Sequence, residues 1–268
     1  MKVRVISALI LLPAVLMAII AGGWAFAAMV LLALGLAGLE YAKLLSLKDY
    51  GLFLPMVWAV VLLWWGDALW GQGTWLGPGM AFLVLLGAAS QLFRSGAKDP
   101  TATWALSLSG GLYLAVGGAY LLRLRALPEG LWWTLTALPV VWIADSAAYL
   151  IGRRWGVHKM APKLSPGKSW EGYAAEVVGG LLSGLLLSMT WGYVGGPLTT
   201  LSPWRGMVLG GVLAILTPLG DLFVSMIKRE VGVKDSGNLI PGHGGMLDRI
   251  DSLLWTGFLS WLVVLILG

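Results

Sequence analysis

Long apolar stretches alternate with short polar ones along this chain, and the alternation sets the architecture that we predict. About 20 consecutive apolar residues cross the hydrocarbon core of a membrane as a helix. By this rule the sequence predicts about nine spans, at roughly 4–21, 24–45, 53–71, 75–93, 102–122, 131–151, 172–194, 206–227 and 251–267. We therefore predict an all-α fold, a polytopic bundle of transmembrane helices. The many glycines suit close packing of such helices in lipid.

Lysine and arginine fall mostly on one side of this predicted topology. With the N-terminus in the cytoplasm, 15 of the 18 basic residues lie on the inner side, and Arg123, Arg125 and Arg205 stay outside. Loops rich in lysine and arginine are typical of the cytoplasmic side. We therefore expect a cytoplasmic N-terminus. The polar loops after the sixth and eighth spans then also face the cytoplasm, where nucleotides are.

Composition excludes several classes of function. A mean hydropathy of +0.83 and the lack of any long polar stretch argue against a soluble domain. The sequence has no cysteine, which rules out disulfides, thiolate catalysis and cysteine-based zinc sites. The net charge of +5 follows from basic loops at a membrane surface, so we expect no nucleic-acid partner.

The segment between residues 225 and 251 concentrates polar chemistry between two apolar stretches. Its ionisable residues are Lys228, Arg229, Glu230, Lys234, Asp235, His243, Asp248, Arg249 and Asp251. Asp248 and Asp251 are spaced i,i+3, so on a helix they share one face about 5–6 Å apart. Two carboxylates that close repel each other unless a cation lies between them. Together with the nearby lysines and arginines, they indicate a site for a metal ion and phosphate.

Upstream of this segment, Asp221, Ser225 and Lys228 are spaced i, i+4 and i+7 near the predicted cytoplasmic end of the eighth span. This spacing puts them on one helix face. Asp221 is therefore a candidate metal ligand beside Asp248 and Asp251. The alternative is a helix-end salt bridge between Asp221 and Lys228.

The stretch from Pro241 to Gly245 must be a turn, because its glycines permit positive φ and a close approach of backbone N–H groups to phosphate. An ordinary re-entry turn before the last span is the alternative. His243 either contacts phosphate or caps the turn. With one other histidine in the chain, a histidine-based zinc site is not expected.

The loop after the sixth span carries a second basic turn. Gly167-Lys168-Ser169 resembles the end of a P-loop, but Pro162 stands where that motif needs glycine, so we reject a Walker site. Lys163 and Lys168 remain suited to triphosphate oxygens. Arg153 and Arg154 are explained by the charge bias alone.

Two further acidic residues lie within predicted spans, Asp145 in the sixth and Glu176 in the seventh. An acid inside a membrane is a functional candidate by default. A hydrogen bond to a neighbouring helix is the alternative for Asp145, and the same alternative weighs more for Glu176.

These motifs together resemble the signature of the phosphatidate cytidylyltransferases, also called CDP-diacylglycerol synthases. The resemblance runs through Ser225-x-Ile227-Lys228-Arg229, Lys234-Asp235-x-Gly237, Ile240-Pro241, His243-Gly244-Gly245-Met246 and Asp248-Arg249-Ile250-Asp251. Upstream, Asp145-Ser146-x-Ala148-Tyr149-x-x-Gly152-Arg153 and Ser165-Pro166-x-Lys168-Ser169-x-Glu171-Gly172 look like a second region of that family, and so does Arg4-Val5-Ile6-Ser7-Ala8.

The resemblance implies a multi-pass enzyme of the inner (plasma) membrane with its active site facing the cytoplasm. It implies CTP and phosphatidic acid as substrates, CDP-diacylglycerol and pyrophosphate as products, and Mg²⁺ as cofactor. We expect a single integral-membrane catalytic domain over residues 1–268. In it, 1–130 form N-terminal spans, and 131–268 form the spans and cytoplasmic loops that carry the active site.

Under this interpretation the candidate site residues have three roles, and some residues have more than one. As catalytic residues we expect Asp221, Asp248, Asp251, Lys228 and Lys168. As Mg²⁺ ligands we expect Asp221, Asp248 and Asp251. As substrate-binding residues we expect Asp145, Ser165, Lys168, Ser169, Glu171, Ser225, Lys228, Arg229, Lys234, Asp235, His243, Gly244, Gly245 and Arg249.

Other functions stay open on the sequence. A CTP-dependent membrane lipid-alcohol kinase shares the need for nucleotide and metal but transfers the γ-phosphate. An ion-coupled transporter would show paired broken helices in two related halves, a symmetry that we do not find. Membrane lipids are expected partners. The sequence leaves open a second cation and a homodimer.

Overall fold

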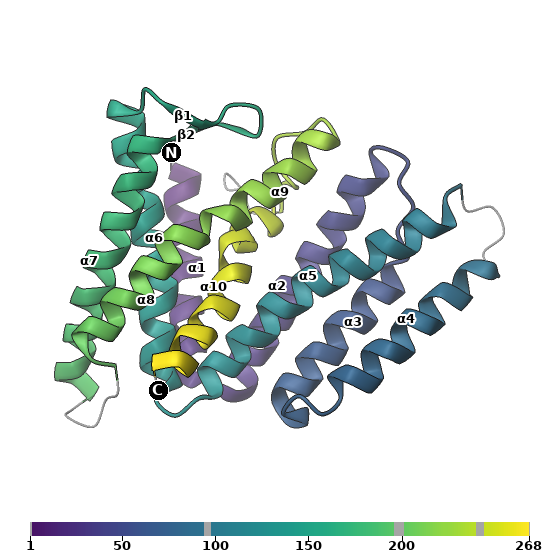
Figure 1. Ribbon diagram of the computed structural model, residues 1–268, viewed down its shortest axis with the longest axis horizontal. Helices are drawn as coiled ribbons and strands as arrows, with labels where there is room; N and C mark the ends of the chain where they lie inside the picture. The colour runs from purple at the N-terminus through teal and green to yellow at the C-terminus, as the bar shows by residue number, and fades with distance from the viewer. Residues whose placement is uncertain (1, 94–97, 196–200, 240–243, 268) are drawn as a thin grey trace. The chain divides into compact units, whose positions relative to one another are not determined.

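The structure is a computed structural model that describes residues 2–93, 98–195, 201–239 and 244–267. Its helices are named in chain order in Figure 1. They are α1 (Lys2–Ala21), α2 (Gly23–Ser46), α3 (Leu54–Gly66), the π-helical turn η1 (Asp67–Gly71), α4 (Leu76–Leu92), α5 (Pro100–Ala126), α6 (Gly130–Trp155), α7 (Trp170–Gly195), α8 (Pro203–Leu216), α9 (Pro218–Glu230) and α10 (Leu247–Leu267). The strands are β1 (Lys159–Ala161) and β2 (Ser165–Ser169).

Each apolar stretch of the sequence falls on a helix, which confirms an all-α, multi-pass membrane protein. Within the described residues, seven helical segments are long and apolar enough to cross a membrane. The helix α4 and the described apolar part of α1, Leu11–Ala21, are shorter than these seven. The predictions of about nine spans and of a cytoplasmic N-terminus therefore stay predictions.

The predicted eighth span is two helices rather than one. Helix α8 ends at Leu216 and α9 begins at Pro218, with Thr217 between them. Proline has no backbone N–H and its ring crowds the preceding turn, so a helix is interrupted before it. The Leu213 carbonyl accepts both the backbone N–H and the hydroxyl of Thr217, each at 2.8 Å, which fixes the end of α8. As a result Asp221 lies in the first turn of a new helix.

The loop after α6 contains a short β-hairpin, which the all-α prediction did not include. β1 pairs antiparallel with β2, with Lys159 opposite Ser169 and Ala161 opposite Ser165. The register shifts between these two pairs. The strands are too short and too rich in glycine, proline and lysine to give the alternating hydrophobic pattern by which strands are predicted.

The chain packs into two compact units, and the division falls within α9 and α10. One unit comprises Met1–Arg123 and Ile227–Ile250, and the other comprises Leu124–Met226 and Asp251–Gly268. We call them the first and the second unit. Compact packing does not decide whether residues 1–268 act as one catalytic domain, so that assignment stays a prediction.

The first unit has a core of aliphatic and aromatic side chains from α2, α3 and α5, including Phe26, Leu34, Val57, Val60 and Leu114, each at most 3% exposed. A buried ion pair lies at the end of α3. Arg123 donates to the Asp67 carboxylate at 2.6 Å, and Asp67 is fully buried. The backbone N–H groups of Gly73 and Trp75 donate to the same carboxylate at 2.9 and 3.0 Å.

In the second unit, α7 and α8 pack backbone against backbone. Gly180 and Gly184 of α7 face Gly206 and Gly210 of α8, and a methyl group at any of the four would collide with a carbonyl of the other helix. Small residues four apart on each helix permit this approach, as they do where helices associate within a membrane. The prediction that glycine serves close helix packing is confirmed here.

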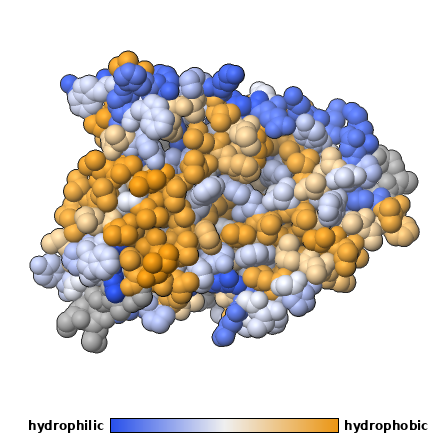
Figure 2. Space-filling model, viewed as in Figure 1, coloured by the Kyte–Doolittle hydropathy of each residue, from blue (hydrophilic) through white to orange (hydrophobic). Residues whose placement is uncertain are grey.

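The outer side of α7 is apolar. Val178, Leu182, Leu186 and Met189 are exposed and recur every three or four residues, so they form one stripe along the helix. Figure 2 shows hydrophobic residues over α7 and hydrophilic residues gathered around the hairpin above it. A contiguous apolar flank of this kind suits contact with lipid acyl chains.

Candidate active site

The candidate site residues gather into a separate polar cluster within each unit. In the first unit, Glu40, Lys228, Ser236, Gly245 and Asp248 form what we call the loop cluster. In the second unit, Asp145, Lys168, Glu176 and Asp221 form the hairpin cluster. Each cluster combines carboxylates with a lysine, which is the composition that a site for a cation and phosphate requires.

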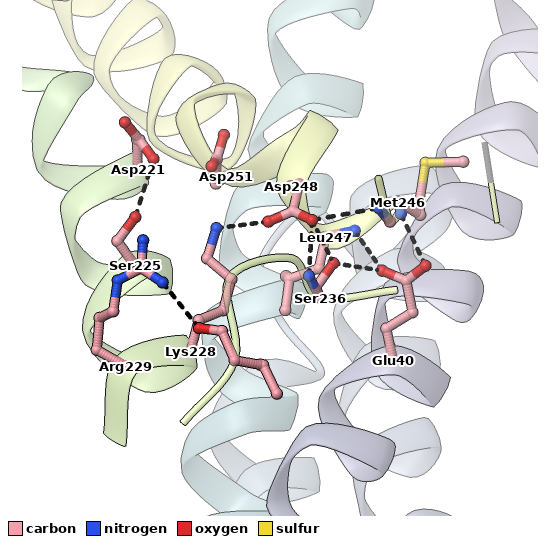
Figure 3. Close-up of polar contacts among 12 residues, drawn as sticks. Glu40, Asp221, Ser225, Lys228, Arg229, Ser236, Met246, Leu247, Asp248 and Asp251 are labelled. Carbon is pink, nitrogen blue, oxygen red and sulfur yellow. Dashed lines mark hydrogen bonds and ion pairs between the residues drawn. The ribbon is translucent and has the colours of Figure 1, made fainter. Parts of the chain in front are cut away.

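Asp248 is the centre of the loop cluster, and both of its oxygens have partners (Figure 3). Its Oδ1 accepts a hydrogen bond from Lys228 Nζ at 2.6 Å. Its Oδ2 accepts from the backbone N–H and the hydroxyl of Ser236, at 2.7 and 2.9 Å, and from the backbone N–H of Gly245 at 3.2 Å. Lys228 and Asp248 are 9% and 8% exposed, so the ion pair is buried. Removing either partner would leave an uncompensated charge.

Glu40 of α2 is the second carboxylate of the loop cluster, and it is 8% exposed. Its Oε1 accepts from the backbone N–H of Met246 at 2.8 Å. Its Oε2 accepts from the backbone N–H of Leu247 at 2.9 Å and from the Ser236 hydroxyl at 2.8 Å. Met246 and Leu247 lie at the start of α10, so Glu40 caps the helix that carries Asp248.

The glycine turn before α10 is described only from Gly244 onwards. Gly244 has a φ of 81°, which confirms that a glycine of this turn takes a positive φ. The N–H of Gly245 donates to the Asp248 carboxylate, so in this structure it stabilises the turn. His243 lies outside the described residues, and its predicted role stays a prediction.

Lys168 and Asp221 form the ion pair of the hairpin cluster. Lys168 Nζ lies 2.8 Å from Asp221 Oδ2, and the side chains are 23% and 32% exposed. The hydroxyl of Ser225, which is buried, donates to Asp221 Oδ1 at 3.3 Å. The shared face of Asp221 and Ser225 is therefore as predicted. The alternative of an Asp221–Lys228 salt bridge is not what the structure has, because each of the two residues pairs with another partner.

Asp145 and Glu176 complete the hairpin cluster. Their side chains share a hydrogen bond, and Lys168 and Asp221 are electrostatic neighbours of both. Glu176 is 4% exposed, and its Oε1 has no hydrogen-bond partner among the described residues. Two carboxyl groups this close need a proton or a cation between them. The hydrogen bond between helices that we weighed as an alternative for Asp145 is thus present.

Two predicted substrate-binding residues hold the hairpin onto α7. Glu171 accepts from the backbone N–H of His158 at 3.2 Å, and its Oε1 lies 2.6 Å from the His158 ring Nδ1. Ser169 is 3% exposed, and its hydroxyl accepts from the Gly172 N–H at 3.2 Å. These contacts position Lys168, which precedes Ser169 on β2. A direct contact of Ser169 or Glu171 with substrate stays a prediction.

The other predicted substrate-binding residues lie outside the two clusters, although Lys234, Asp235 and Arg249 lie close in sequence to residues of the loop cluster. Ser165 is half-buried on β2, and Lys234, Asp235 and Arg249 are at least partly exposed. Arg229 donates to the Val233 carbonyl at 2.9 Å and so closes the turn after α9. Their roles in binding stay predictions.

Asp251 lies close to Asp221, because α9 and α10 approach each other at these residues. A methyl group on Gly220, which precedes Asp221, would lie 2.5 Å from the carbonyl oxygen of Asp251. Figure 3 shows Asp221 on α9 and Asp251 on α10. Asp251 is 8% exposed, and its Oδ1 accepts from the Ser252 N–H at 2.7 Å.

Asp221 and Asp251 fit a Mg²⁺ site by chemistry, because carboxylate oxygens are the ligands that Mg²⁺ prefers. Asp221 and Asp248 each have both oxygens engaged by other groups, so the roles of the three aspartates as ligands stay predictions. No group of three acidic or histidine side chains in metal-binding geometry occurs among the described residues.

Comparison with known proteins agrees with these chemical features. The model of the cytidylyltransferase family matches residues 2–267. The chain belongs to this family. Among curated cytidylyltransferases, it is 36% identical to the phosphatidate cytidylyltransferase of Haemophilus influenzae over 282 aligned positions, which cover 94% of each chain. It is 32% identical to the phosphatidate cytidylyltransferase of Staphylococcus haemolyticus, with 95% of each chain covered. A Mycobacterium bovis phosphatidate cytidylyltransferase is 38% identical over 52% of this chain and 44% of its own length.

Sequence reasoning missed Glu40 and Ser236, although the structure puts both in the loop cluster. Glu40 had a usable signal, since it is an acid within an apolar span, and such acids are functional candidates. Ser236 had none, because a single serine in a polar loop is ordinary. The link between them joins residues 196 positions apart, and no local pattern reports on such a contact.

Proposed function

We propose that this chain is a phosphatidate cytidylyltransferase, which makes CDP-diacylglycerol and pyrophosphate from CTP and phosphatidic acid. The match to the cytidylyltransferase family over residues 2–267 carries the proposal. It is supported by relatives named phosphatidate cytidylyltransferase that align over nearly the whole chain. The polar clusters described above supply the charges that two phosphate-bearing substrates need.

In this reaction a phosphate oxygen of phosphatidic acid attacks the α-phosphorus of CTP. The bond from that phosphorus to the β-phosphate oxygen breaks, and pyrophosphate leaves. The nucleophile is already an anion near neutral pH, so the protein needs no general base. Phosphoryl transfer of this kind depends on positioning and on neutralising charge.

Cationic side chains of this chain would bind the phosphates of the substrates. Lys168 in the second unit and Lys228 in the first are the candidates, because each pairs with an aspartate that a substrate phosphate can displace. Arg229 lies at the end of α9 and Lys234 just beyond it, so both add positive charge close to Lys228 in the sequence. Arginine and lysine donors to phosphate form charge-assisted hydrogen bonds, which are stronger than neutral ones.

Mg²⁺ is the cofactor that we propose, held by Asp221 and Asp251, with Asp248 as the predicted third ligand. When bound, such an ion neutralises charge on the phosphate oxygens. To become a ligand, Asp248 would have to release its ion pair with Lys228. Asp145 and Glu176 are the candidates for a second cation.

We further propose that the enzyme spans the inner (plasma) membrane about nine times, with its N-terminus and active site on the cytoplasmic side. The 15 to 3 distribution of basic residues supports this orientation. The acyl chains of phosphatidic acid then stay in the bilayer while its headgroup reaches the site.

The test is an assay with purified protein, phosphatidic acid and CTP labelled at either the α- or the γ-phosphate, with and without Mg²⁺. A cytidylyltransferase moves the α-label into lipid and releases the γ-label as pyrophosphate. A CTP-dependent lipid-alcohol kinase moves the γ-label into lipid, so γ-label in the lipid would replace our proposal with that one. An ion-coupled transporter leaves both labels in CTP.

A further inference from the structure

Glu40 is an acidic residue within the apolar helix α2, and its carboxylate binds a segment near the other end of the chain. It receives the N–H groups of Met246 and Leu247 and the hydroxyl of Ser236, at 2.8 to 2.9 Å. Burying a carboxylate is costly unless it is well hydrogen-bonded. Two N–H donors and a hydroxyl within hydrogen-bond distance of one buried carboxylate show that the surrounding loop is built around it.

The first N–H groups of a helix have no partner within the helix. In α10, Glu40 supplies that partner from another helix, and its negative charge also suits the positive end of the helix dipole. The residue that follows these N–H groups is Asp248. The position of the Asp248 carboxylate therefore depends on how Glu40 holds the first turn of α10.

Ser236 joins Glu40 directly to Asp248. Its hydroxyl oxygen lies 2.8 Å from Glu40 Oε2 and 2.9 Å from Asp248 Oδ2. A hydroxyl carries one proton and donates to one acceptor at a time. If one of the two carboxylates loses its negative charge, the hydroxyl proton of Ser236 is therefore donated to the other. Asp248 in turn holds Lys228 at 2.6 Å, so the connection runs from α2 to the lysine.

Glycines make room for this arrangement. A methyl group on Gly237 would lie 2.8 Å from Glu40 Oε1, and one on Gly245 would collide with both Glu40 and Ser236. The loop thus encloses the carboxylate closely on two sides. Such fit is expected of a residue that fixes the position of others.

We propose that Glu40 is a positioning residue for cytidylyl transfer: it fixes the first turn of α10 and, through Ser236, the Asp248–Lys228 pair. The expected effect on catalysis rests on the proposed function. The expected effect on the position of the loop rests on the contacts alone. Residues that orient the groups in direct contact with metal or substrate typically change affinity or activity by about 10- to 100-fold when replaced.

The test compares Glu40→Gln with Tyr41→Phe. Glutamine keeps the shape of the side chain but replaces one acceptor oxygen by a donor, which cannot receive the N–H of Leu247 or Met246. Tyr41→Phe is the matched control, because it removes a buried hydrogen bond, to the Leu106 carbonyl at 3.2 Å, from the adjacent position on the same helix. We expect kcat/KM for CTP to fall about 10- to 100-fold in Glu40→Gln and to stay near the wild-type value in Tyr41→Phe.

A readout independent of activity separates this proposal from the proposed function. The chain has no native cysteine, so Leu239→Cys, at an exposed position of the loop, reports on the loop through its rate of maleimide labelling. We expect labelling to speed up when Glu40→Gln is added and not when Tyr41→Phe is added. If the wild-type protein makes no CDP-diacylglycerol, the proposed function fails, and the labelling rates still decide whether Glu40 holds the loop.

Ser236→Ala provides a second test in case the Glu40→Gln variant does not fold. It keeps both N–H contacts of Glu40 and removes only the hydroxyl, so we expect a smaller fall in kcat/KM and a normal yield. Where both single variants fold, their effects should be non-additive, because they break the same connection. Wild-type kinetics and labelling in Ser236→Ala and in any folded Glu40→Gln would overturn the proposal. So would a loss of yield with unchanged kinetics of the folded fraction.

Discussion

At the scale of single residues, lysine and aspartate are paired where the substrates are proposed to bind. Lys168 pairs with Asp221, and Lys228 pairs with Asp248. A phosphate that reaches either lysine competes with the carboxylate for it. The more exposed pair, Lys168–Asp221, gives up its lysine at the lower cost, because water already screens it.

Lys168→Ala is therefore expected to raise KM for CTP about tenfold, in line with the 1.5–3 kcal/mol of a charged hydrogen bond taken at its lower end. KM for phosphatidic acid should change less. Lys159→Ala is the control, since Lys159 is exposed on β1 of the same hairpin. Separate titrations of the two substrates measure the effect. A defect confined to phosphatidic acid would move the hairpin to the lipid side of the site.

Asp248→Asn and Asp251→Asn are each expected to remove nearly all activity. Asp251→Asn should leave inserted, folded protein, whereas Asp248→Asn also leaves the buried Lys228 without its counter-charge and should lower the yield. Asparagine keeps the shape but loses the charge that a metal ion or Lys228 requires. An aspartate in a surface ion pair would contribute only about 1 kcal/mol, so its loss would be mild.

Rate measured against Mg²⁺ concentration distinguishes the roles of these two aspartates. Loss of a ligand raises the half-saturating Mg²⁺ concentration, whereas loss of a residue that only holds Lys228 lowers kcat without that shift. Near-normal turnover of both variants at ordinary Mg²⁺ would make both carboxylates structural, and the search for the metal site would then turn to Asp145 and Glu176.

The sequence allowed some of these residue contacts to be predicted and not others. Asp221 and Ser225 were predicted to share a face, because i,i+4 spacing on a helix fixes that locally. The Lys168–Asp221 pair joins positions far apart in the chain, and hydropathy does not say which helices become neighbours. Ser169 was predicted to bind phosphate, but its burial against Gly172 follows from how the hairpin meets α7, which the sequence does not show.

At the scale of elements, the helices are where the apolar stretches predict them, because helix length and hydropathy are set by the bilayer. The departures have local causes. Pro218 divides one predicted span into α8 and α9, and the hairpin forms in a segment without strand periodicity. Close packing of α7 on α8 depends on glycines that hydropathy alone does not distinguish from spacers.

Gly184→Ala tests this packing. Its methyl group would meet the backbone of Gly206 and Gly210, which cannot move as a flexible side chain can. We expect a loss of about 1–3 kcal/mol in unfolding free energy, the usual cost of overpacking. Gly192→Ala is the control on the same helix, since its methyl group meets nothing within 4 Å. Unfolding of both variants in detergent measures the difference, and equal stability would show that α7 and α8 do not depend on this contact.

At the scale of the whole molecule, the distribution of charge predicts the orientation in the membrane. The hairpin loop, the end of α9 and the loop after it carry Lys159, Lys163, Lys168, Lys228, Arg229 and Lys234, whereas three arginines occupy the predicted outer side. The bias is strong because short basic loops are retained in the cytoplasm during insertion.

Single-cysteine labelling checks the orientation in a chain that has no native cysteine. Gly167→Cys, in open space on the hairpin, should react only from the cytoplasmic side. Thr74→Cys, exposed after η1, should react only from outside. Labelling of Thr74→Cys from the cytoplasm alone would overturn the predicted topology. Each variant should first be shown to keep wild-type turnover.

The bond between Glu40 and the start of α10 also constrains the order of biogenesis. Its partners are made 206 and 207 residues after it, so α2 enters the membrane long before the ribosome supplies the N–H groups that its carboxylate needs. Until then the nascent chain holds an acid in an apolar helix without those donors. A transcript truncated before codon 246 would leave that acid permanently without them. We expect such a product to be less stable in the membrane than the complete chain, because a buried carboxylate without hydrogen-bond donors is costly.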